Sequence, residues 1–384
     1  MKNILGYLLL IAGVQICCAS ESAMLKIFDR AYNLNPAENL LYSPYGVEQC
    51  FGMIACGAGE QSGRELADVL GIRPAAKKRH PVLRKKLHGQ ADVNSFNAVL
   101  YNRDFALYPE FIRDCREIYG GRIFKLDFSR PEQCVKLLNQ LAQKESRGIF
   151  DEVFKQDDLK QDDAAVLMNV LYFKAPWLEK FEKYNTEKEL FYPVAGTPYK
   201  VDMMYSSREL PYFEENGIQA VTLYYQDPAY AMMAIKAIDK NVPLKQVTGF
   251  LTQKGIAHIE SNSHTRWEVR LWLPKLQLNV KNDLIRLFKK LGMEITFDPI
   301  RGDIDKMVIG KPLYVSRAEQ LVQLKMDEDG SEVAALTTVD LTVGSAVPGA
   351  ETIKKEFRAD HPFILVLYNR NTKDILLTAA IVKP

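Results

Sequence analysis

The chain has 384 residues, of which 47% are hydrophobic and 26% are charged, a composition typical of folded globular proteins and not of disordered ones. Its 50 basic and 48 acidic residues leave a formal net charge of +2, so no overall field attracts nucleic acid or a membrane surface. The length suits one large domain or two modest ones.

The first twenty residues have the pattern of a secretory leader. Lys2 precedes the apolar run Ile4–Val14, and small residues suited to cleavage stand at Cys17–Ser20. The run is too short to span a membrane, and no later stretch is long enough. We therefore predict a signal peptide over residues 1–20 and a secreted, extracellular mature chain over residues 21–384, with no membrane partner.

Four cysteines follow the leader, too few for a disulfide framework in a chain of this length. Cys50 and Cys56 lie in an apolar stretch and are expected to pack as small hydrophobic side chains. Whether Cys115 and Cys134 form a bridge stays open. The five histidines show no metal-ligand spacing, so we expect no bound metal.

The N-terminal part is predicted to be helical. Ser22–Leu34 has apolar residues at helical spacing, and Ser43 and Pro44 are the residue types of a helix start for a second, apolar helix that runs through Cys56. A third helix is predicted over Gly63–Leu70. The glycine-rich link between the last two helices has no strand before it, so we interpret it as a turn and expect no nucleotide or other cofactor.

From Asn94 onward, short strands and helices alternate. A strand over Phe96–Tyr101 is followed by helices over Pro109–Ile118 and Pro131–Ser146, and then by Ala164–Lys174. That last stretch is apolar on both faces, which predicts a central strand of a sheet. Further elements are predicted at Ala220–Tyr225, Met232–Ile238, Arg266–Leu273, Leu313–Leu324 and Phe363–Leu367 (strands) and near Asn282–Leu291 (helix). Because no linker-like composition separates them, we predict one domain.

Residues 328–350 combine the pattern of a strand with the composition of a loop. Counting by twos from Ser331 to Leu341 gives uncharged and mostly small residues, whereas the intervening positions include Glu332 and Asp340. Glycines stand at both ends of the stretch, as is typical of exposed loops. We interpret the stretch as a loop that can become a strand.

Five sequence blocks stand out along the chain. Two of them are D-E-D-G-S-E-V-A-A (residues 327–335) and F-R-A-D-H-P-F (Phe357–Phe363). The other three are Leu41–Pro44, Met168–Trp177 and Leu273–Lys275. In these blocks and in their order the chain resembles the serpin family: the first block is similar to the hinge of the family's loop, and the second to the segment that follows the loop. The resemblance spans almost the whole mature chain.

The resemblance implies an α+β serpin fold, with helices packed on a large mixed β-sheet, smaller sheets, and an exposed reactive-centre loop over about residues 328–356. It also implies a serine protease inhibitor whose loop is cut, traps the protease covalently, and inserts into the sheet as an extra strand. The sequence lacks the common catalytic motifs, and His361 is expected to be structural. We therefore predict that the chain is not an enzyme.

The resemblance implies functional residues at three places in this chain. The first is the loop hinge, with Glu328, Gly330, Ser331, Glu332, Val333, Ala334 and Ala335. The second is a loop-entry latch, in which Glu328 pairs with Lys275 beside Trp177. The third is the mid-point of the sheet, with Ser43, Asn169 and Gln320, where Gly46 and Gln320 replace the family's usual serine and histidine.

The count from the hinge predicts cleavage between Gly344 and Ser345, with Val343, Ala346 and Val347 as alternatives. These small or aliphatic residues favour an elastase-like or chymotrypsin-like serine protease, and a cysteine protease is a further alternative. A trypsin-like target is less favoured. It would need Lys354, Lys355 or Arg358, where the resemblance implies that the chain already re-enters a sheet.

Two further readings stay open. The dense basic cluster at residues 77–86 is interpreted first as a solvated helix face, but by resemblance it lies near the helix where some serpins bind heparin-like polyanions. Its members are Lys77, Lys78, Arg79, Arg84, Lys85 and Lys86. The departures Val333, Leu336, Gly46 and Gln320 leave open the alternative of a non-inhibitory binding, carrier or storage protein. A monomer is expected.

Overall fold

The computed structural model describes residues 21–72, 91–265, 267–310, 313–331 and 354–384. The predicted leader at residues 1–20 lies outside them. Within the described part, no helix has the length and apolar character needed to cross a membrane.

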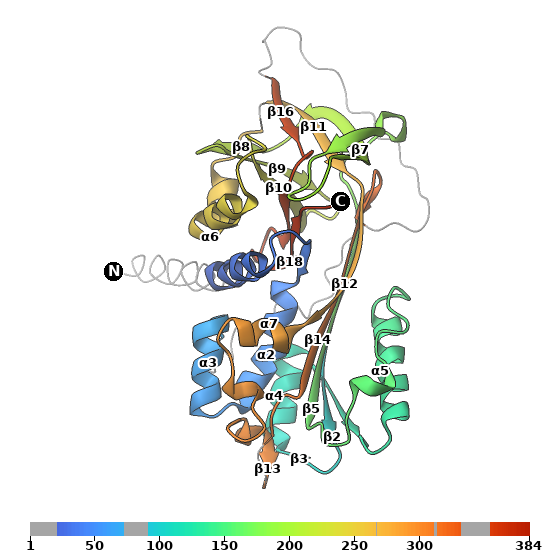
Figure 1. Ribbon diagram of the computed structural model, residues 1–384, viewed down its shortest axis with the longest axis vertical. Helices are drawn as coiled ribbons and strands as arrows, with labels where there is room; N and C mark the ends of the chain where they lie inside the picture. Colours follow the sequence, from blue (N-terminus) through green and yellow to red (C-terminus); the bar gives the residue numbers. More distant parts are fainter. Residues whose placement is uncertain (1–20, 73–90, 266, 311–312, 332–353) are drawn as a thin grey trace, which may run out of the picture.

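The central sheet runs along the long axis of the molecule (Figure 1). Its strand order is β12 (Leu276–Asp283), β14 (Arg317–Met326), β15 (Gly330–Ser331), β5 (Ala165–Pro176), β2 (Asp92–Asn102) and β4 (Arg122–Leu126). The first eight residues of β5 are all buried. The prediction of a central strand here is therefore confirmed. The sequence of β5 is apolar on both faces because other parts of the protein pack on both faces of the sheet.

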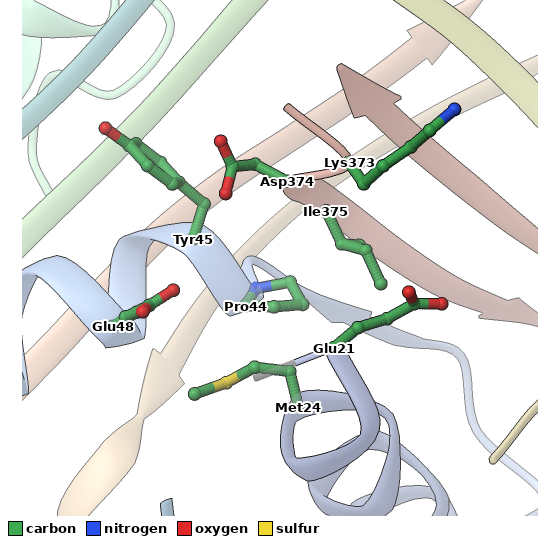
Figure 2. Close-up of a pocket in the computed structure, with 8 residues that line it drawn as sticks. All are labelled: Glu21, Met24, Pro44, Tyr45, Glu48, Lys373, Asp374 and Ile375. Atoms are coloured by element: carbon green, nitrogen blue, oxygen red, sulfur yellow. The ribbon is translucent and has the colours of Figure 1, made fainter. Parts of the chain in front are cut away.

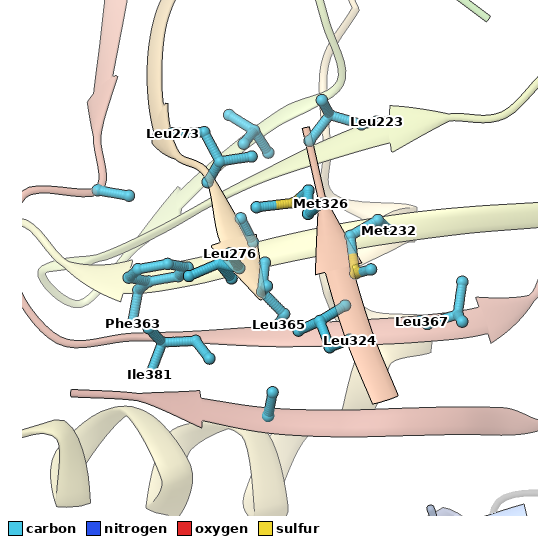
Figure 3. Close-up of a cluster of buried hydrophobic side chains, with 14 of the residues drawn as sticks. Leu223, Met232, Leu273, Leu276, Leu324, Met326, Phe363, Leu365, Leu367 and Ile381 are labelled. Atoms are coloured by element: carbon cyan, nitrogen blue, oxygen red, sulfur yellow. The ribbon is translucent and has the colours of Figure 1, made fainter. Parts of the chain in front are cut away.

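Two other sheets lie at the upper end of the molecule in Figure 1. The second sheet has the order β1 (Leu40–Tyr42), β18 (Ile375–Ile381), β17 (Phe363–Asn369), β10 (Tyr230–Ala237), β9 (Ile218–Tyr224) and β8 (Tyr212–Glu215). The third sheet has the order β16 (Lys354–Arg358), β11 (Glu268–Pro274), β7 (Tyr199–Glu209) and β6 (Glu187–Phe191), and a short pair joins β13 (Val308–Ile309) to β3 (Ala106–Leu107). Figure 3 shows the core in which Leu324 and Met326 of β14 meet Leu365 of β17.

Helices cover both faces of the central sheet. Residues 21–34 are helical, followed by α2 (Pro44–Gly57), α3 (Glu60–Leu70), α4 (Pro109–Tyr119), α5 (Pro131–Glu145), α6 (Leu244–Ser261) and α7 (Leu284–Lys290). Single 3₁₀ turns occur at η2 (Gln156–Asp158), η3 (Lys183–Asn185), η4 (Ile295–Phe297) and η5 (Asp305–Met307). In Figure 1, α5 lies on one side of the sheet and α2, α3 and α4 lie on the other.

The α+β class and most predicted elements are confirmed. Helix α2 starts at Pro44, and the hydroxyl of its N-cap residue Ser43 accepts a hydrogen bond from the backbone N–H of Gly46, as its sequence predicted. The strand predicted from Leu313 was wrong at its start, because ladder pairing begins only at Arg317. The short polar-faced strands and α6 were not predicted.

All four cysteines of the described chain are free, so Cys115 and Cys134 form no bridge. Cys115 of α4 packs among side chains of α2 and α4, whereas Cys134 of α5 packs in the cluster between α5 and the central sheet. The central sheet lies between these two clusters, since alternate residues of β2 and β5 contribute to each. Burial raises the pKa of the Cys50 thiol to about 12, in keeping with its predicted role as a small hydrophobic side chain.

Candidate functional site at the opening of the central sheet

Strand β15 begins the predicted loop inside the central sheet. After β14 the chain turns at Asp327–Asp329 and forms β15, which pairs antiparallel with β14 on one side and with β5 on the other. Its last residue, Ser331, is 3% exposed and is paired with Met326 and Ala175. The strand therefore runs toward the N-terminal ends of β14 and β5, along the seam between them.

The seam is closed beyond β15. Residues Arg317–Val322 of β14 pair in parallel with Val166–Leu171 of β5. A strand that continued from Ser331 would have to separate these two stretches, and it would then be antiparallel to both of them. Antiparallel pairing is the slightly more stable arrangement per residue.

Gly330 is the position where β15 comes closest to β5. A Cβ atom placed there would lie 2.3 Å from the carbonyl oxygen of Ala175 and 2.7 Å from the Cα of Pro176. The next residue is fixed from another direction, because the hydroxyl oxygens of Ser331 and Tyr225 are 2.6 Å apart. Only glycine fits this approach to the β5 backbone.

Glu328 is held at the loop entry by two side chains. Lys275 Nζ lies 2.9 Å and 3.1 Å from its two carboxylate oxygens, and the hydroxyl of Thr186 donates to the same carboxylate over 2.8 Å. Burial alone would raise the pKa of the Glu328 carboxyl. Hydrogen bonds from Lys275, from the backbone N–H of Glu328 itself and from Thr186, together with the positive charge of Lys275, outweigh burial and keep that pKa below its ordinary value of 4.5. The carboxylate is therefore charged at neutral pH.

Trp177 packs against the same turn at the loop entry. Its side chain is fully buried, stacks on Tyr225 with ring centroids 4.6 Å apart, and donates its indole N–H to the carbonyl of Asp327 over 3.0 Å. The last residue of the turn, Asp329, forms ion pairs with Lys180 and Lys183 at 2.9 Å and 3.0 Å. The structure thus brings all three latch residues of the sequence analysis to one turn.

Replacing Lys275 by methionine is expected to lower the free energy of unfolding by about 1–3 kcal/mol at neutral pH, because a buried carboxylate loses its cation. The folded-state pKa of Glu328 is depressed, so the ion pair stabilises the fold above the ordinary pKa of 4.5 and loses this effect as pH falls through the folded value. The difference between wild type and variant should therefore shrink in acid. Urea unfolding at several pH values measures it, with the exposed Lys200→Met on β7 as the control; a difference independent of pH would contradict the assignment.

The sheet mid-point joins α2 to β14. Gln320 accepts a hydrogen bond from the backbone N–H of Ser43 over 2.9 Å and donates to the carbonyl of Ser43 over 3.0 Å. The hydroxyl of Ser43 donates to the carbonyl of Leu376 in β18 over 2.7 Å. Gln320 thereby ties β14 to the start of α2 with both groups of its amide.

Asn169 lies opposite Gln320 across the seam. It is fully buried, and its amide N–H donates to Asn97 over 2.8 Å, whereas its side-chain oxygen has no hydrogen-bond partner among the described residues. A Cβ on Gly46 would lie 2.1 Å from that oxygen. Any side chain at position 46 would therefore overlap Asn169 unless Asn169 moves.

Gly46→Ala is expected to cost about 1–3 kcal/mol of stability, because the new methyl group displaces Asn169 from its buried hydrogen bonds. Gly46→Ser should cost less, since its hydroxyl can donate to the unpartnered oxygen of Asn169. Equilibrium unfolding in urea gives the order of the two variants. A serine variant less stable than the alanine variant would contradict this account.

The remaining predicted site residues are only partly described. Glu332, Val333, Ala334 and Ala335 of the hinge, Val343, Gly344, Ser345, Ala346 and Val347 of the scissile region, and Lys77, Lys78, Arg79, Arg84, Lys85 and Lys86 of the basic cluster lie outside the described residues. Lys354, Lys355 and Arg358 belong to β16, which pairs with β11, so the expected re-entry into a sheet is confirmed. Both ring nitrogens of His361 contact oxygen acceptors, at Asp360 and Ala237.

Three residues of the site were not predicted. Thr186, Tyr225 and Asp329 each contact the loop entry. No periodicity or motif distinguishes Thr186 or Tyr225, because their contacts arise from tertiary packing alone. Asp329 belongs to the hinge block at residues 327–335, but nothing in the sequence predicts that it pairs with Lys180 and Lys183.

Two cavities among the described residues lie away from this site. The cavity in Figure 2 has a volume of about 30 Å³, which is room for one or two water molecules. A cleft of about 360 Å³ lies among Pro211, Thr222, Tyr224, Glu260, Ser261, Ser263, Arg370 and Lys373. The first is too small for a ligand of ordinary size, and the lining of the second is mainly polar, whereas carriers of small molecules typically have mainly apolar pockets.

The sequence matches the family model described as Serpin (serine protease inhibitor) over residues 19–384. It is 25% identical to plasminogen activator inhibitor 1 of Bos taurus over 94% of this chain and 90% of that protein. It is 27% identical to Iripin-2 of Ixodes ricinus over 100% of this chain and 98% of that protein.

Solved structures show the same fold. Native protease nexin-1 with heparin matches with a TM-score of 0.85 at 21% identity, covering 97% of this chain and all of that one. Thyroxine-binding globulin in complex with thyroxine matches with a TM-score of 0.82 at 20% identity, covering 96% and 98%.

The prediction that the chain is not an enzyme needs a correction. It was based on missing catalytic motifs, whereas the family description names a class of proteins directly, the serine protease inhibitors. The matched model spans the central sheet, the loop entry and the strand β16 that follows the loop. The chain belongs to the serpin family.

Proposed function

We propose that the chain is a secreted inhibitor of an extracellular serine protease that acts by loop cleavage, covalent trapping and strand insertion. The observation that carries the proposal is β15, which already lies between β14 and β5 and is antiparallel to both. A cut after this strand would free residues 332 onward to extend the same pairing along the seam.

The chemistry of trapping belongs to the protease. Its serine attacks the carbonyl carbon of the scissile residue, the peptide bond to the next residue breaks, and the new amino group takes up a proton. The protease then remains as an ester on the new C-terminus. Insertion of the preceding residues would carry this ester away from the loop before water can hydrolyse it.

The sequence of the inserting stretch supports the proposal energetically. Burying Val333, Val339 and Leu341 would contribute about 1.5–3 kcal/mol each, and new ladder hydrogen bonds about 0.5–1.5 kcal/mol each. No charge occupies an inward position from Ser331 to Leu341, and no proline occurs there. The closed pairing of Arg317–Val322 with Val166–Leu171 is what insertion would have to replace.

The target and the setting are part of the proposal. Gly344 and Ser345 favour an elastase-like protease with a shallow primary pocket, and the apolar alternative Val343 also suits a chymotrypsin-like one. The leader pattern at residues 1–20 supports secretion. The basic cluster at residues 77–86 supports binding of a heparin-like polyanion, as does the likeness to a nexin structure solved with heparin.

The test is incubation of the mature protein with pancreatic elastase, chymotrypsin and trypsin in separate reactions. A complex that survives denaturing electrophoresis supports the proposal, and the mass of the released C-terminal peptide identifies the scissile bond. If every protease cuts the loop without trapping, and the cut protein unfolds at the same temperature as the intact one, the non-inhibitory alternative replaces it. Neither cavity of the described part favours a carrier role strongly enough to rank that alternative first.

A further inference from the structure

The two faces of the seam between β14 and β5 carry different side chains. On the α5 side, Val170 of β5 and Leu321 of β14 belong to the cluster that includes α5, and they are paired across the seam. On the opposite side, Met326 and Ala175, the partners of Ser331, belong to the core shared with the second sheet. Since successive side chains of a strand alternate between faces, an extended β15 would direct its even-numbered residues toward α5.

The register of such an extension follows from the described pairs. Ser331 pairs with Met326 of β14 and with Ala175 of β5, and both pairings are antiparallel. Each step forward along β15 would therefore be one step back along both neighbours. The pairs that close the seam below, such as Arg317 with Val166, have the same offset between β14 and β5. One residue of the extended strand would thus lie between the members of each pair without any slip of register.

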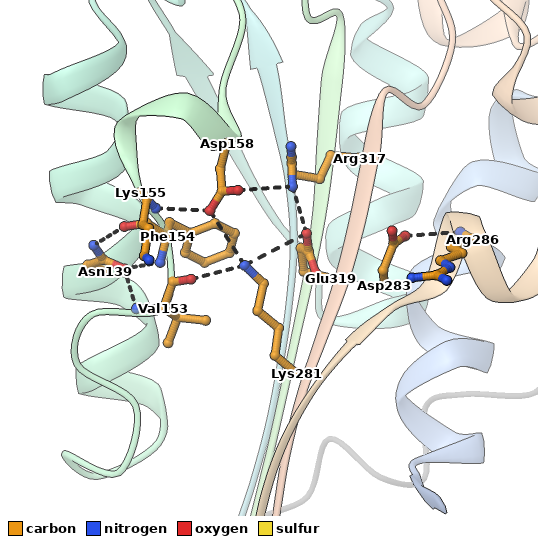
Figure 4. A network of polar contacts seen from close by, with 10 residues as sticks. All are labelled: Asn139, Val153, Phe154, Lys155, Asp158, Lys281, Asp283, Arg286, Arg317 and Glu319. Atoms are coloured by element: carbon orange, nitrogen blue, oxygen red, sulfur yellow. Dashed lines mark hydrogen bonds and ion pairs between the residues drawn. The ribbon is translucent and has the colours of Figure 1, made fainter. Parts of the chain in front are cut away.

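Arg317 and Glu319 form the polar lower end of the α5-side face. Arg317 donates to Glu319 over 2.9 Å and lies at the looser distance of 3.8 Å from Asp158 (Figure 4). Glu319 is 3% exposed, and its second carboxylate oxygen has no hydrogen-bond partner among the described residues. The register would place Asp340 opposite Arg317 and Thr338 opposite Glu319. A carboxylate would then face the guanidinium, and a hydroxyl donor would lie beside the acid with the unpartnered oxygen.

The middle of the same face is apolar. The register would place Leu336 between Leu321 and Val170, which are both fully buried in the α5-side cluster. Leu336 is one of the departures of this chain from the family pattern. Its size suits this position, because its side chain would join an apolar cluster and not a polar surface.

Two lysines flank the seam at the upper end of the face. The register would place residue 332 between Lys325 of β14 and Lys174 of β5, and both lysines are half-buried. Residue 332 is a glutamate. In an extended β15 its carboxylate would therefore stand between two ammonium groups, and opposite charges on neighbouring strands attract.

We propose that the α5-side face of the seam recognises the chain's own residues 332–340, through the two lysines at its upper end and Arg317 at its lower end. Glu332 would pair with the lysines and Asp340 with Arg317. The inference rests on the proposed function and deepens it, because it names side chains that determine which strand the seam accepts. A strand shifted by two residues would keep its faces but lose both charge pairs, so the charges also fix the register.

The test is a competition between two synthetic peptides for the intact mature protein. One peptide has the sequence of residues 331–344, and the other carries Asp340→Lys in that sequence. Both are present in excess over the protein, and mass spectrometry of the isolated complex gives the ratio in which they are bound. We expect the unchanged peptide to be bound about five- to tenfold more, because the variant places a like charge opposite Arg317.

Variants of the protein assign the preference to the named side chains. In Arg317→Gln the preference should disappear, whereas Arg286→Gln, at an exposed position of α7, is the matched control and should keep it. At the upper end, a peptide with Glu332→Lys should be disfavoured by the wild type and less so by Lys325→Gln. A preference that survives in Arg317→Gln, or that disappears in both arginine variants, would contradict the role of Arg317.

The outcomes separate the recognition face from the proposed function. If the wild type binds both peptides equally, the recognition face is overturned and the proposed function stands. If it binds neither, the comparison is made within the chain: cut Asp340→Lys should gain less resistance to guanidinium unfolding than the cut wild type, and equal gains overturn the recognition face. If the cut wild type gains none, the proposed function fails and the recognition face fails with it.

Discussion

Replacing Trp177 by alanine is expected to lower the free energy of unfolding by about 3–5 kcal/mol, the usual cost of truncating a fully buried aromatic side chain. The indole is completely buried and stacks on Tyr225 with an interplanar angle of 14°. Its removal also leaves the carbonyl of Asp327 without the N–H that it accepts over 3.0 Å. The effect is therefore both a packing loss and a polar loss.

The Trp177→Ala substitution is also expected to affect the loop entry, because Tyr225 contacts both Trp177 and Ser331. The hydroxyl of Tyr225 contacts that of Ser331 at 2.6 Å, so a tyrosine released from its stacking partner no longer fixes β15. We expect the variant to take up an added synthetic peptide with the sequence of residues 331–344 faster than the wild type, in addition to being less stable. Far-ultraviolet circular dichroism in urea measures the stability, since fluorescence changes with the loss of the tryptophan itself.

Two further variants separate the causes. Trp177→Phe keeps an aromatic ring but loses the N–H, and should cost about 1–2 kcal/mol, the price of one unmade buried hydrogen bond plus a small cavity. Trp272→Ala makes the same truncation at a half-buried position beside Tyr205 and Arg358, and should cost less than Trp177→Ala. Equal losses at the two tryptophans would contradict the assignment of Trp177 to the loop entry.

Local sequence signals predicted the buried elements best. Helices α2, α4 and α5 start at prolines and show clear apolar spacing, and β5 is apolar throughout, so pattern and structure agree there. Helix α6 was missed because its apolar pattern is interrupted at Gly255, which has a φ of 77° inside the element. Strand β12 was missed because alternate residues face solvent and its apolar face alone is weak evidence.

The site depends on long-range contacts that no local pattern contains. Lys275 and Glu328 are 53 residues apart, and their pairing could be expected only from the resemblance to a known family. The contact of Lys281 with Val153 spans 128 residues and has no counterpart in any motif of the sequence. Such pairs follow from the order of strands in the sheet, which sequence periodicity does not determine.

Replacing Gly330 by alanine is expected to displace β15 from the seam. The new Cβ would lie 2.3 Å from the carbonyl oxygen of Ala175, a backbone atom of β5 directly after Lys174, where the pairing of β5 with β2 ends. The variant should lose the pairing of Ser331 with Ala175 and Met326, at a cost of about 1–3 kcal/mol for the hydrogen bonds involved.

The functional effect of this change should exceed its effect on stability. In the proposed mechanism, insertion competes with hydrolysis of the ester. A barrier higher by about 1.4 kcal/mol would slow insertion tenfold and shift the products from trapped protease to cut inhibitor. The ratio of stable complex to cleaved protein on denaturing gels measures this partition. Gly249→Ala, at an open helical position of α6, is the control and should leave the ratio unchanged, because no neighbouring atom opposes its methyl group. A Gly330→Ala variant that traps protease as completely as the wild type would show that β15 does not have to occupy the seam before insertion begins.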